Sequence, residues 1–433
     1  MQLQYGLDDK PPFLKTVLFG LQWAALLIAT VIILGKVVGV IHYTDQYAQI
    51  LYLRKLFFIS SITLACQVFF GHRLPLLPGP SAVLLIGIMA CKSFDIPVIY
   101  TSIVIGGAVV VIVTMSGLLR HINRLFTNNV ISIVLILIAF TMAPEILNLM
   151  IDKKSGIDPS CNLGFALATV FIMFLLHGFL KGVLKSIIVI WAIIFGSIAY
   201  YLVFTINMPA AADNSTWISS AVINMNFKLS FHPGVIISFL FCYFALLIND
   251  LGSIESVNEI LELRERQGRV KRGITITGFA NMAAGFFGVI GPVNFSISPG
   301  IILSTGCASR FAMIPAAVIL FVLSFLPAVT EVIGGVPSVV IGAVLAYVMA
   351  SQIAAGLIVA FKDTGKEGYR MENGMVIGFS IFLGTIVAFL PMGIVENIPL
   401  YLRPVLTNGF VAGVISAVFL EQILIKNRVK SDT

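Results

Sequence analysis

Apolar runs long enough to cross a lipid bilayer as helices recur along this chain from Leu14 to Ile425. A helix needs roughly 20 apolar residues to span the hydrocarbon core. The runs are continuous rather than alternating at every second residue, which excludes a membrane β-barrel. The composition agrees, because 58% of the 433 residues are hydrophobic and only 11% are charged. The sequence therefore predicts an all-α integral membrane protein embedded in a lipid bilayer.

The N-terminal head and the cysteines exclude several other classes. The first apolar run follows Asp8, Asp9 and two prolines and has no small-residue cleavage site, so we interpret it as a retained helix rather than a signal peptide. The five cysteines are scattered, with no CxxC pair and no histidine at ligand spacing. We expect no metal, no cofactor, no disulfide framework and no nucleic-acid partner.

Span lengths and flanking polar residues predict about fourteen membrane segments. Lysine and arginine are more frequent on the side that holds both ends of the chain, so both termini are predicted to be cytoplasmic. The predicted segments are 14–35, 48–71, 80–91, 97–117, 128–150, 162–177, 185–206, 233–252, 274–290, 298–307, 311–329, 337–360, 373–391 and 404–426.

The long polar loop 207–232 divides the predicted spans into two halves, 1–206 and 233–433. About seven spans in each half place the halves in opposite orientations, which is the topology of an inverted repeat. We expect the connecting loop to be extracytoplasmic. The third and tenth segments are too short to cross alone, and they occupy corresponding places in the two halves.

Proline and glycine interrupt both short segments, in LPLLPGPS (Leu74 to Ser81) and GPVNFSISPG (Gly291 to Gly300). Irregular backbone at membrane depth is tolerated only where protein buries it or where it lines a cavity. Paired interruptions of this kind point to a transport site near the bilayer midplane. The alternative is that each is an ordinary kink or external loop.

The two segments then supply half-helices whose N-termini point toward one another. Helix N-termini carry partial positive charge and free N–H groups, which favour electronegative ligand groups. Ser81 and Ser298 are predicted to act as caps. Gly79, Ser81, Ser298 and Gly300 are therefore candidate solute-binding residues.

A second candidate site lies in the eighth span. Asp250 is a carboxylate near the inner end of an apolar run, and such residues are functional candidates by default. Its alternative role is that of an interfacial residue before an amphipathic stretch. Asn249 points about 100° round the helix from it and can hydrogen-bond a polar ligand.

The run GPVNFSISPGIILSTGCASR (Gly291 to Arg310) resembles the tenth-span signature of the nucleobase–cation symporter 2 family, the xanthine/uracil permeases or nucleobase–ascorbate transporters. VPSVVIGA, INDLGS (Ile248 to Ser253) and PPFLKTVLFGLQW are further matches. The resemblance implies fourteen helices in two inverted seven-helix repeats, with core and gate domains. It also implies alternating access and a bacterial inner membrane.

The resemblance further implies uptake of a nucleobase such as uracil or xanthine, often with protons, by a protein that can form a homodimer. The family usually places a glutamate where this chain has Asn249, an acidic or amide residue at Ile297, and a polar or titrating residue at Ser253. Asp250 is therefore the candidate for proton coupling.

The predicted function is secondary transport of a small polar solute, and a nucleobase is the leading candidate for that solute. The alternative is an anion transporter of the same fold, of the sulfate or bicarbonate type, because facing helix N-termini without a carboxylate at position 297 favour an anion. An intramembrane enzyme is not supported, since no HExxH motif, Ser/His pair or cofactor loop is present. A sensor that no longer transports is a third class.

Overall fold

The protein is described by a computed structural model. The described residues are 3–119, 127–153, 155–180, 184, 188–205, 219, 228–263, 265–295, 298–361, 371–399 and 402–422. Most of the predicted loop 207–232 therefore lies outside them, as do Ile297 and the C-terminal end.

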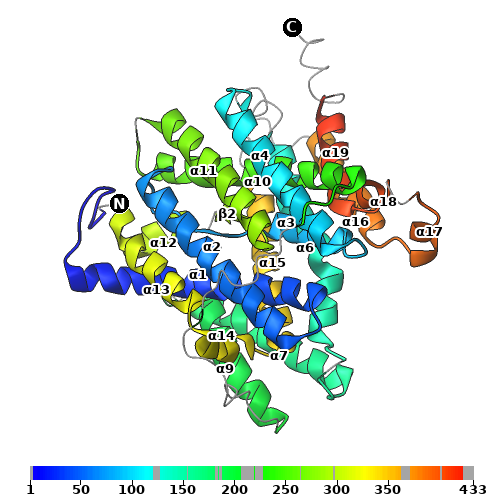
Figure 1. Ribbon diagram of the computed structural model, residues 1–433, viewed down its shortest axis with the longest axis horizontal. Coiled ribbons are helices and arrows are strands. Elements are labelled where there is room, and N and C mark those ends of the chain that lie inside the picture. Colours follow the sequence, from blue (N-terminus) through cyan, green and yellow to red (C-terminus); the bar gives the residue numbers. More distant parts are fainter. Residues whose placement is uncertain are drawn as a thin grey trace.

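Helices dominate both halves (Figure 1). The first half contains α1 (Phe13–His42), α2 (Gln46–Phe69), β1 (Pro78–Pro80), α3 (Ala82–Ala90), α4 (Ile96–Met115), α6 (Asn128–Met150), α7 (Pro159–Phe179) and α9 (Ile188–Val203). The second contains α10 (Pro233–Ile260), α11 (Arg266–Phe287), β2 (Pro292–Asn294), α12 (Ser298–Thr305), the 3-10 helix η2 (Arg310–Met313), α13 (Ile314–Ser324), α14 (Pro327–Gly334), α15 (Ser338–Ala360), α16 (Met371–Ala388), α17 (Met392–Glu396), α18 (Arg403–Leu406) and α19 (Gly409–Leu420).

Many of these helices have the length and hydropathy of membrane spans. Within the described residues eight helices satisfy both criteria, or nine if the bent pair 310–324 and 327–334 is one span. Two shorter apolar helices, α9 and α19, add to them. The chain is thus a multi-pass helical membrane protein. The exact count of fourteen crossings and the inverted repeat stay predictions.

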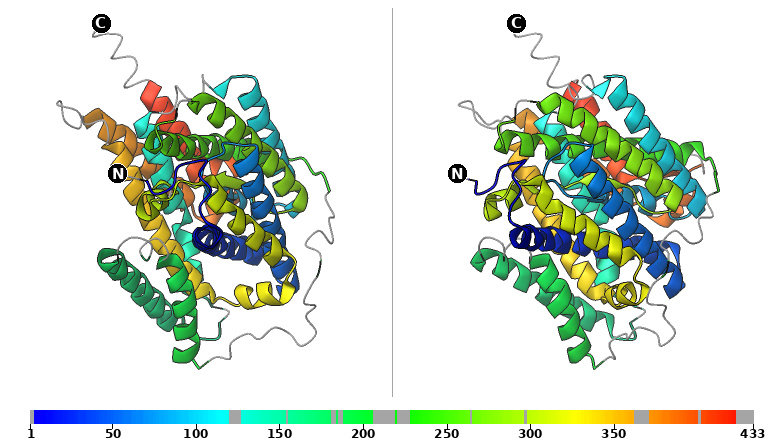
Figure 2. Two further views of the ribbon diagram at one scale, coloured as in Figure 1. Left: turned by 90° about the vertical axis from the view of Figure 1, so that its left-hand side faces the viewer. Right: turned by 60° about the vertical axis from the view of Figure 1, so that its left-hand side comes forward.

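Contacts sort the helices into two bundles. The first bundle contains α1 to α4 and α10 to α13, and the second contains α6, α7, α9, α15, α16 and α19. Elements of the first bundle, such as α11 and α13, lie on the left of Figure 1, and α16 and α19 lie on the right. In Figure 2, α7 and α9 lie at the lower end of the molecule, where both contact α15. Each bundle therefore combines helices from both halves of the sequence.

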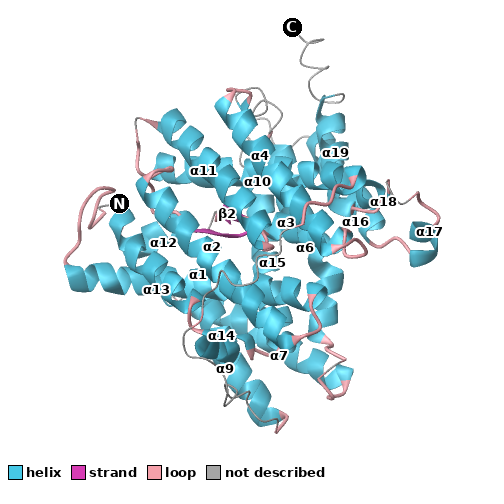
Figure 3. Ribbon diagram, viewed as in Figure 1, coloured by secondary structure: helices cyan, strands magenta, loops and turns pink. Residues whose placement is uncertain are grey.

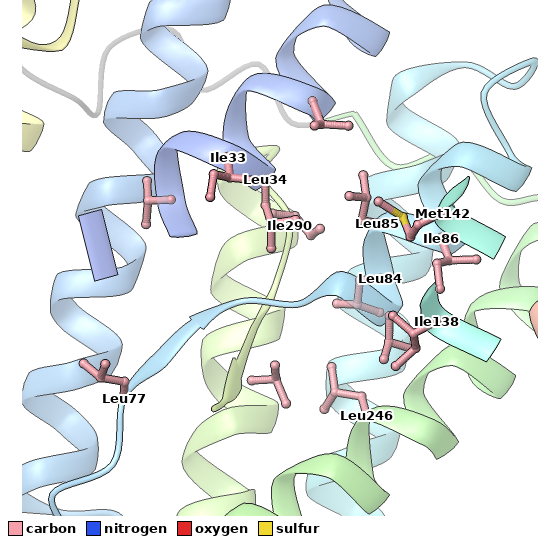
Figure 4. Packing of buried hydrophobic residues seen from close by; sticks show 14 of the residues in the cluster. Ile33, Leu34, Leu77, Leu84, Leu85, Ile86, Ile138, Met142, Leu246 and Ile290 are labelled. Carbon is pink, nitrogen blue, oxygen red and sulfur yellow. The ribbon is translucent and has the colours of Figure 1, made fainter. Parts of the chain in front are cut away.

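The short helix α3 links the two bundles. Its apolar side chains, Leu84 to Ile86, lie next to Ile138 and Met142 of α6 (Figure 4). All five side chains are buried. Because α3 directly follows β1, this apolar contact connects the centre of the first bundle with the second bundle.

Glycine lets α4 and α11 approach closely within the first bundle. A Cβ atom on Gly107 would lie 2.7 Å from the backbone nitrogen of Met282 and 2.8 Å from the backbone oxygen of Gly278. Real Cβ atoms are not found so close to backbone atoms. The packing of these two helices therefore depends on the missing side chain.

Gly107→Val is expected to destabilise the protein by about 3 kcal/mol or more, because overpacking must push two backbones apart. Gly164→Val on α7 is the matched control, since no atom lies within 4 Å of a Cβ built there. The measurement is the melting temperature of each detergent-purified variant. Equal losses in the two variants would contradict this account of the α4–α11 contact.

The N-terminal segment pairs with the chain that follows α12. The backbone nitrogen of Gln4 donates to the oxygen of Gly306 at 2.8 Å, and Ala308 donates to the oxygen of Tyr5 at 2.9 Å. Asp8 forms an ion pair with Arg310 at 2.7 Å. The segment before the first helix is thus held against the signature region near residue 310.

Candidate transport site

Two short strands lie in the middle of the helices (Figure 3). β1 and β2 form an antiparallel pair in which Pro78 is opposite Asn294, and Pro80 is opposite Pro292. Each strand leads into a short helix, α3 or α12, and the antiparallel pairing sends these helices off from opposite ends of the ribbon. The two interrupted segments therefore meet, and their irregular backbone is paired within the protein rather than exposed to lipid.

The two candidate serines have different local roles. Ser81 is the N-cap of α3, where its hydroxyl accepts from the nitrogen of Leu84 at 3.4 Å. Ser298 is the first residue of α12, and its hydroxyl accepts from the nitrogen of Leu77 at 3.1 Å. It donates to the oxygen of Phe295, also at 3.1 Å. The hydroxyl of Ser298 therefore joins the two interrupted segments, and its expected role as a cap stays a prediction.

The other strand-region candidates place an aromatic ring beside β1. A Cβ on Gly79 would lie 2.6 Å from the Phe295 ring and 2.7 Å from Leu27, so only glycine leaves room for that ring. Phe295 itself is half-buried, and its nitrogen donates to the oxygen of Leu77 at 2.8 Å. Gly300 lies in the first turn of α12. Phe295 belongs to the stretch GPVNFSISPG, but the sequence pattern did not single it out, because an aromatic residue is ordinary in an apolar chain.

Asp250 is fully buried and contacts β2 rather than the membrane interface. Its Oδ1 accepts two hydrogen bonds from Asn294, one from the backbone nitrogen at 3.0 Å and one from Nδ2 at 2.6 Å. The hydroxyl of Thr277 on α11 also faces the carboxyl group. Its Oδ2 has no hydrogen bond of regular geometry among the described residues. The interfacial alternative for Asp250 is therefore wrong.

Asn294 continues this polar contact toward His72, which lies between α2 and β1. The Oδ1 of Asn294 is 3.2 Å from Nε2 of His72. The Nδ1 of His72 accepts from the nitrogen of Leu74 at 3.0 Å, so Nε2 must carry the hydrogen that Asn294 accepts. Both side chains are fully buried. Neither residue was among the candidates selected from the sequence.

A second buried amide supports the start of β2. The Nδ2 of Asn281 on α11 donates to the oxygen of Pro292 at 2.8 Å. Its Oδ1 accepts from the hydroxyl of Tyr243 at 2.9 Å. This contact holds the strand in place without a carboxylate.

Asn249 lies on α10 one residue before Asp250 and is half-buried. No hydrogen bond to its side chain occurs among the described residues, in contrast to the engaged hydroxyls of Ser81 and Ser298. An amide offers two donors and one acceptor oxygen, so Asn249 retains its capacity to bind a polar ligand. Within the described residues no group of three His, Cys, Asp or Glu side chains could hold a metal ion.

Two paired irregular strands lie at the centre of this helical membrane protein, and each leads into a half-helix. Secondary transporters have this arrangement. Comparison with known proteins then identifies the group. The chain belongs to the xanthine/uracil permease family, since the model of that permease family matches residues 14–393. It is therefore a transport protein rather than an enzyme.

Two curated relatives span almost the whole chain. A putative purine permease of Clostridium perfringens is 25% identical, and the match covers 98% of this chain and 93% of the relative. The xanthine permease of Bacillus subtilis is also 25% identical over 94% of this chain and 93% of its own length. The resemblance stated from the sequence is confirmed.

A solved structure shares the fold. The transmembrane domain of a cyanobacterium bicarbonate transporter, BicA, has a TM-score of 0.64 at 14% identity. The match covers 96% of this chain and 100% of that domain. At this identity the comparison concerns the fold alone.

Proposed function

We propose that this permease moves a nucleobase, and specifically a purine such as xanthine or urate, across the cell membrane by alternating access. The support comes from the purine and xanthine permeases that match almost its whole length, together with Asn249 on α10, the helix that contacts both α3 and α12. A purine is flat and presents alternating donors and acceptors at its edge. It needs both an aromatic face and paired polar groups from the protein.

The residues around the strand pair have corresponding roles. The amide of Asn249 would hydrogen-bond one edge of the base, and the backbone amides at the starts of α3 and α12 would approach its carbonyl oxygens. Gly79 makes room for the Phe295 ring beside β1, and Gly300 lies in the first turn of α12, whereas the hydroxyls of Ser81 and Ser298 hold the segments in position. The half-buried ring of Phe295 would stack on the base.

Two domain-level proposals complete the mechanism. Residues 1–206 and 233–433 would form the inverted repeats joined by the extracytoplasmic loop 207–232, and the first bundle would move as a core against the second as a gate. The excess of lysine and arginine on one side supports cytoplasmic termini, and the family supports a bacterial inner membrane and a homodimer.

Asp250 would couple uptake to protons. A fully buried carboxyl group with one oxygen outside any regular hydrogen bond to the described residues is a natural proton acceptor at membrane depth. It is adjacent in sequence to the proposed ligand Asn249 and contacts the strand that leads to α12. Proton and base would thus bind within one connected region.

The second candidate function is transport of an anion such as bicarbonate or sulfate. The fold match to the bicarbonate transporter domain favours it, as does the partial positive charge of two facing helix N-termini. Against it stand the curated purine and xanthine permeases, which match almost the whole chain.

Thermal stabilisation of the purified protein separates the two. A ligand that binds only the folded state stabilises it by about 2.7 kcal/mol at a concentration one hundred times its Kd. We expect xanthine, urate or guanine to raise the melting temperature by a few degrees, and sulfate and bicarbonate to leave it unchanged. Stabilisation by anions alone would reverse the order of the two functions.

A further inference from the structure

Asn294 on β2 has four polar groups, two in its backbone and two in its side chain, and each has a hydrogen-bond partner. Its backbone nitrogen and Nδ2 both donate to Oδ1 of Asp250. Its Oδ1 accepts from Nε2 of His72, and its backbone oxygen accepts from the hydroxyl of Ser253 at 3.0 Å. The strand is therefore tied to α10 by three hydrogen bonds, two of which end on a single carboxylate oxygen.

The partners of Asn294 determine which atom donates in each of these hydrogen bonds. The orientation of its side-chain amide is therefore not an arbitrary assignment. The Leu74 nitrogen can only donate, so it makes Nδ1 of His72 an acceptor and Nε2 the protonated nitrogen. That N–H requires Oδ1 of Asn294 as its acceptor, which leaves Nδ2 to donate to Asp250. The chain His72 to Asn294 to Asp250 thus has one polarity when Asp250 is ionised.

Asn294 also lies within the proposed substrate site. It is followed directly by Phe295, whose ring rests on Gly79, and four residues later α12 begins. Asp250 follows Asn249 on α10. The contact between Asp250 and Asn294 therefore joins the two elements that would hold the base from opposite sides.

We propose that Asn294 is the positioning residue that transmits the protonation state of Asp250 to β2 and hence to the substrate site. The inference rests on the proposed proton-coupled function. Hydrogen bonds to an ionised carboxylate are roughly twice as strong as those between neutral groups. Protonation of Asp250 weakens both bonds from Asn294 at once, which releases β2 and Phe295 to close on the base. By linkage, a bound base then favours the protonated carboxyl group.

The groups around this unit are few on the described elements. α11 contributes Thr277, whose hydroxyl is 3.5 Å from Nδ2 of Asn294. α2 contributes Gln67, which donates to that same hydroxyl at 3.1 Å. α11 also contributes the charged Arg269, which donates to the backbone oxygen of His72 at 3.1 Å. Arg269 therefore contacts the His72 end of this series of hydrogen bonds and not the Asp250 end.

The test exchanges the amide for a carboxyl group of the same shape. Asn294→Asp removes the donor Nδ2 and places two carboxyl groups in contact, so that they share a proton. We expect the midpoint of pH-dependent xanthine uptake into proteoliposomes to move upward by about one unit or more. The pH dependence of the ligand-free melting temperature should change over the same interval.

The double variant Asp250→Asn with Asn294→Asp swaps the two groups and restores one amide and one carboxylate. The amide at position 250 can donate to the carboxylate at 294 while its oxygen still accepts from the backbone nitrogen there. Tyr243→Phe is the control, because it removes the hydrogen bond to Asn281 near β2 and leaves Asp250 untouched. It is expected to lower the melting temperature without moving the pH midpoint.

Recovery of a wild-type pH profile in the double variant, together with the upward shift in Asn294→Asp, supports the inference. An unchanged profile in a folded Asn294→Asp protein overturns it, whatever happens to the uptake rate. If Asn294→Asp fails to fold, the double variant decides alone by the presence or absence of pH dependence. If xanthine and other bases do not bind but the ligand-free melting shift occurs, the proposed function fails while the role of Asn294 is supported.

Discussion

Replacement of Asn249 by alanine is expected to weaken binding of the transported base and so to raise the KM of its uptake. Loss of the amide leaves a polar edge of the bound base without a partner in a site closed to water, at a cost of about 1–3 kcal/mol. That corresponds to about a 5- to 150-fold loss in affinity. The half-buried side chain makes no hydrogen bond within the described residues, so its removal should not destabilise the fold.

Ser256→Ala is the matched control on the same helix. Its hydroxyl donates only to the oxygen of Ser253, at 2.9 Å, so it serves its own helix rather than a ligand. Concentration dependence of radiolabelled xanthine uptake in proteoliposomes is the measurement. Saturable transport with an unchanged KM in Asn249→Ala would remove this residue from the site.

Asp250→Asn is expected to abolish accumulation against a gradient while exchange of base for base continues. The asparagine oxygen can still accept both hydrogen bonds from Asn294, so β2 stays in place. The variant has no titratable group there, and a single coupled proton drives about tenfold accumulation for each unit of pH difference. Accumulation should therefore fall to the level outside the vesicle.

The measurement is uptake of radiolabelled xanthine with and without an imposed pH gradient, alongside exchange from preloaded vesicles. Loss of both activities in a protein that keeps its melting temperature would make Asp250 a binding residue rather than a coupling residue. Full accumulation in the variant would assign the proton to another group.

The positions of the two interrupted segments could be predicted from sequence, although their pairing as strands could not, because the prolines and glycines of LPLLPGPS and GPVNFSISPG would break any helix that continued through them. Asp250 stood out for a similar reason, since a carboxylate at membrane depth needs a partner. The identity of that partner could not be predicted. Asn294 lies 44 residues further along the chain, and no spacing rule connects the two.

His72 and Ser298 show the same limit. His72 sits between an apolar helix and a proline-rich stretch, where its local sequence suggests a loop residue, and only folding places it against Asn294. Serine at the start of a half-helix predicts a cap, but the hydrogen bond from the Leu77 nitrogen to the hydroxyl of Ser298 could not be predicted from that local rule. Local rules predicted Ser81 correctly, since its hydroxyl accepts from the nitrogen of Leu84 at the N-cap of α3.

The pairing of β1 with β2 sets the order in which the chain can mature during synthesis. The backbone nitrogen of Leu77 can pair with the hydroxyl of Ser298 only after 221 further residues have been synthesised. At roughly 5–20 residues per second, the first strand stays unpaired for on the order of 10–40 seconds after it leaves the ribosome. Its backbone must be kept away from lipid during that interval. The first interrupted segment therefore cannot complete its pairing until translation has passed residue 298.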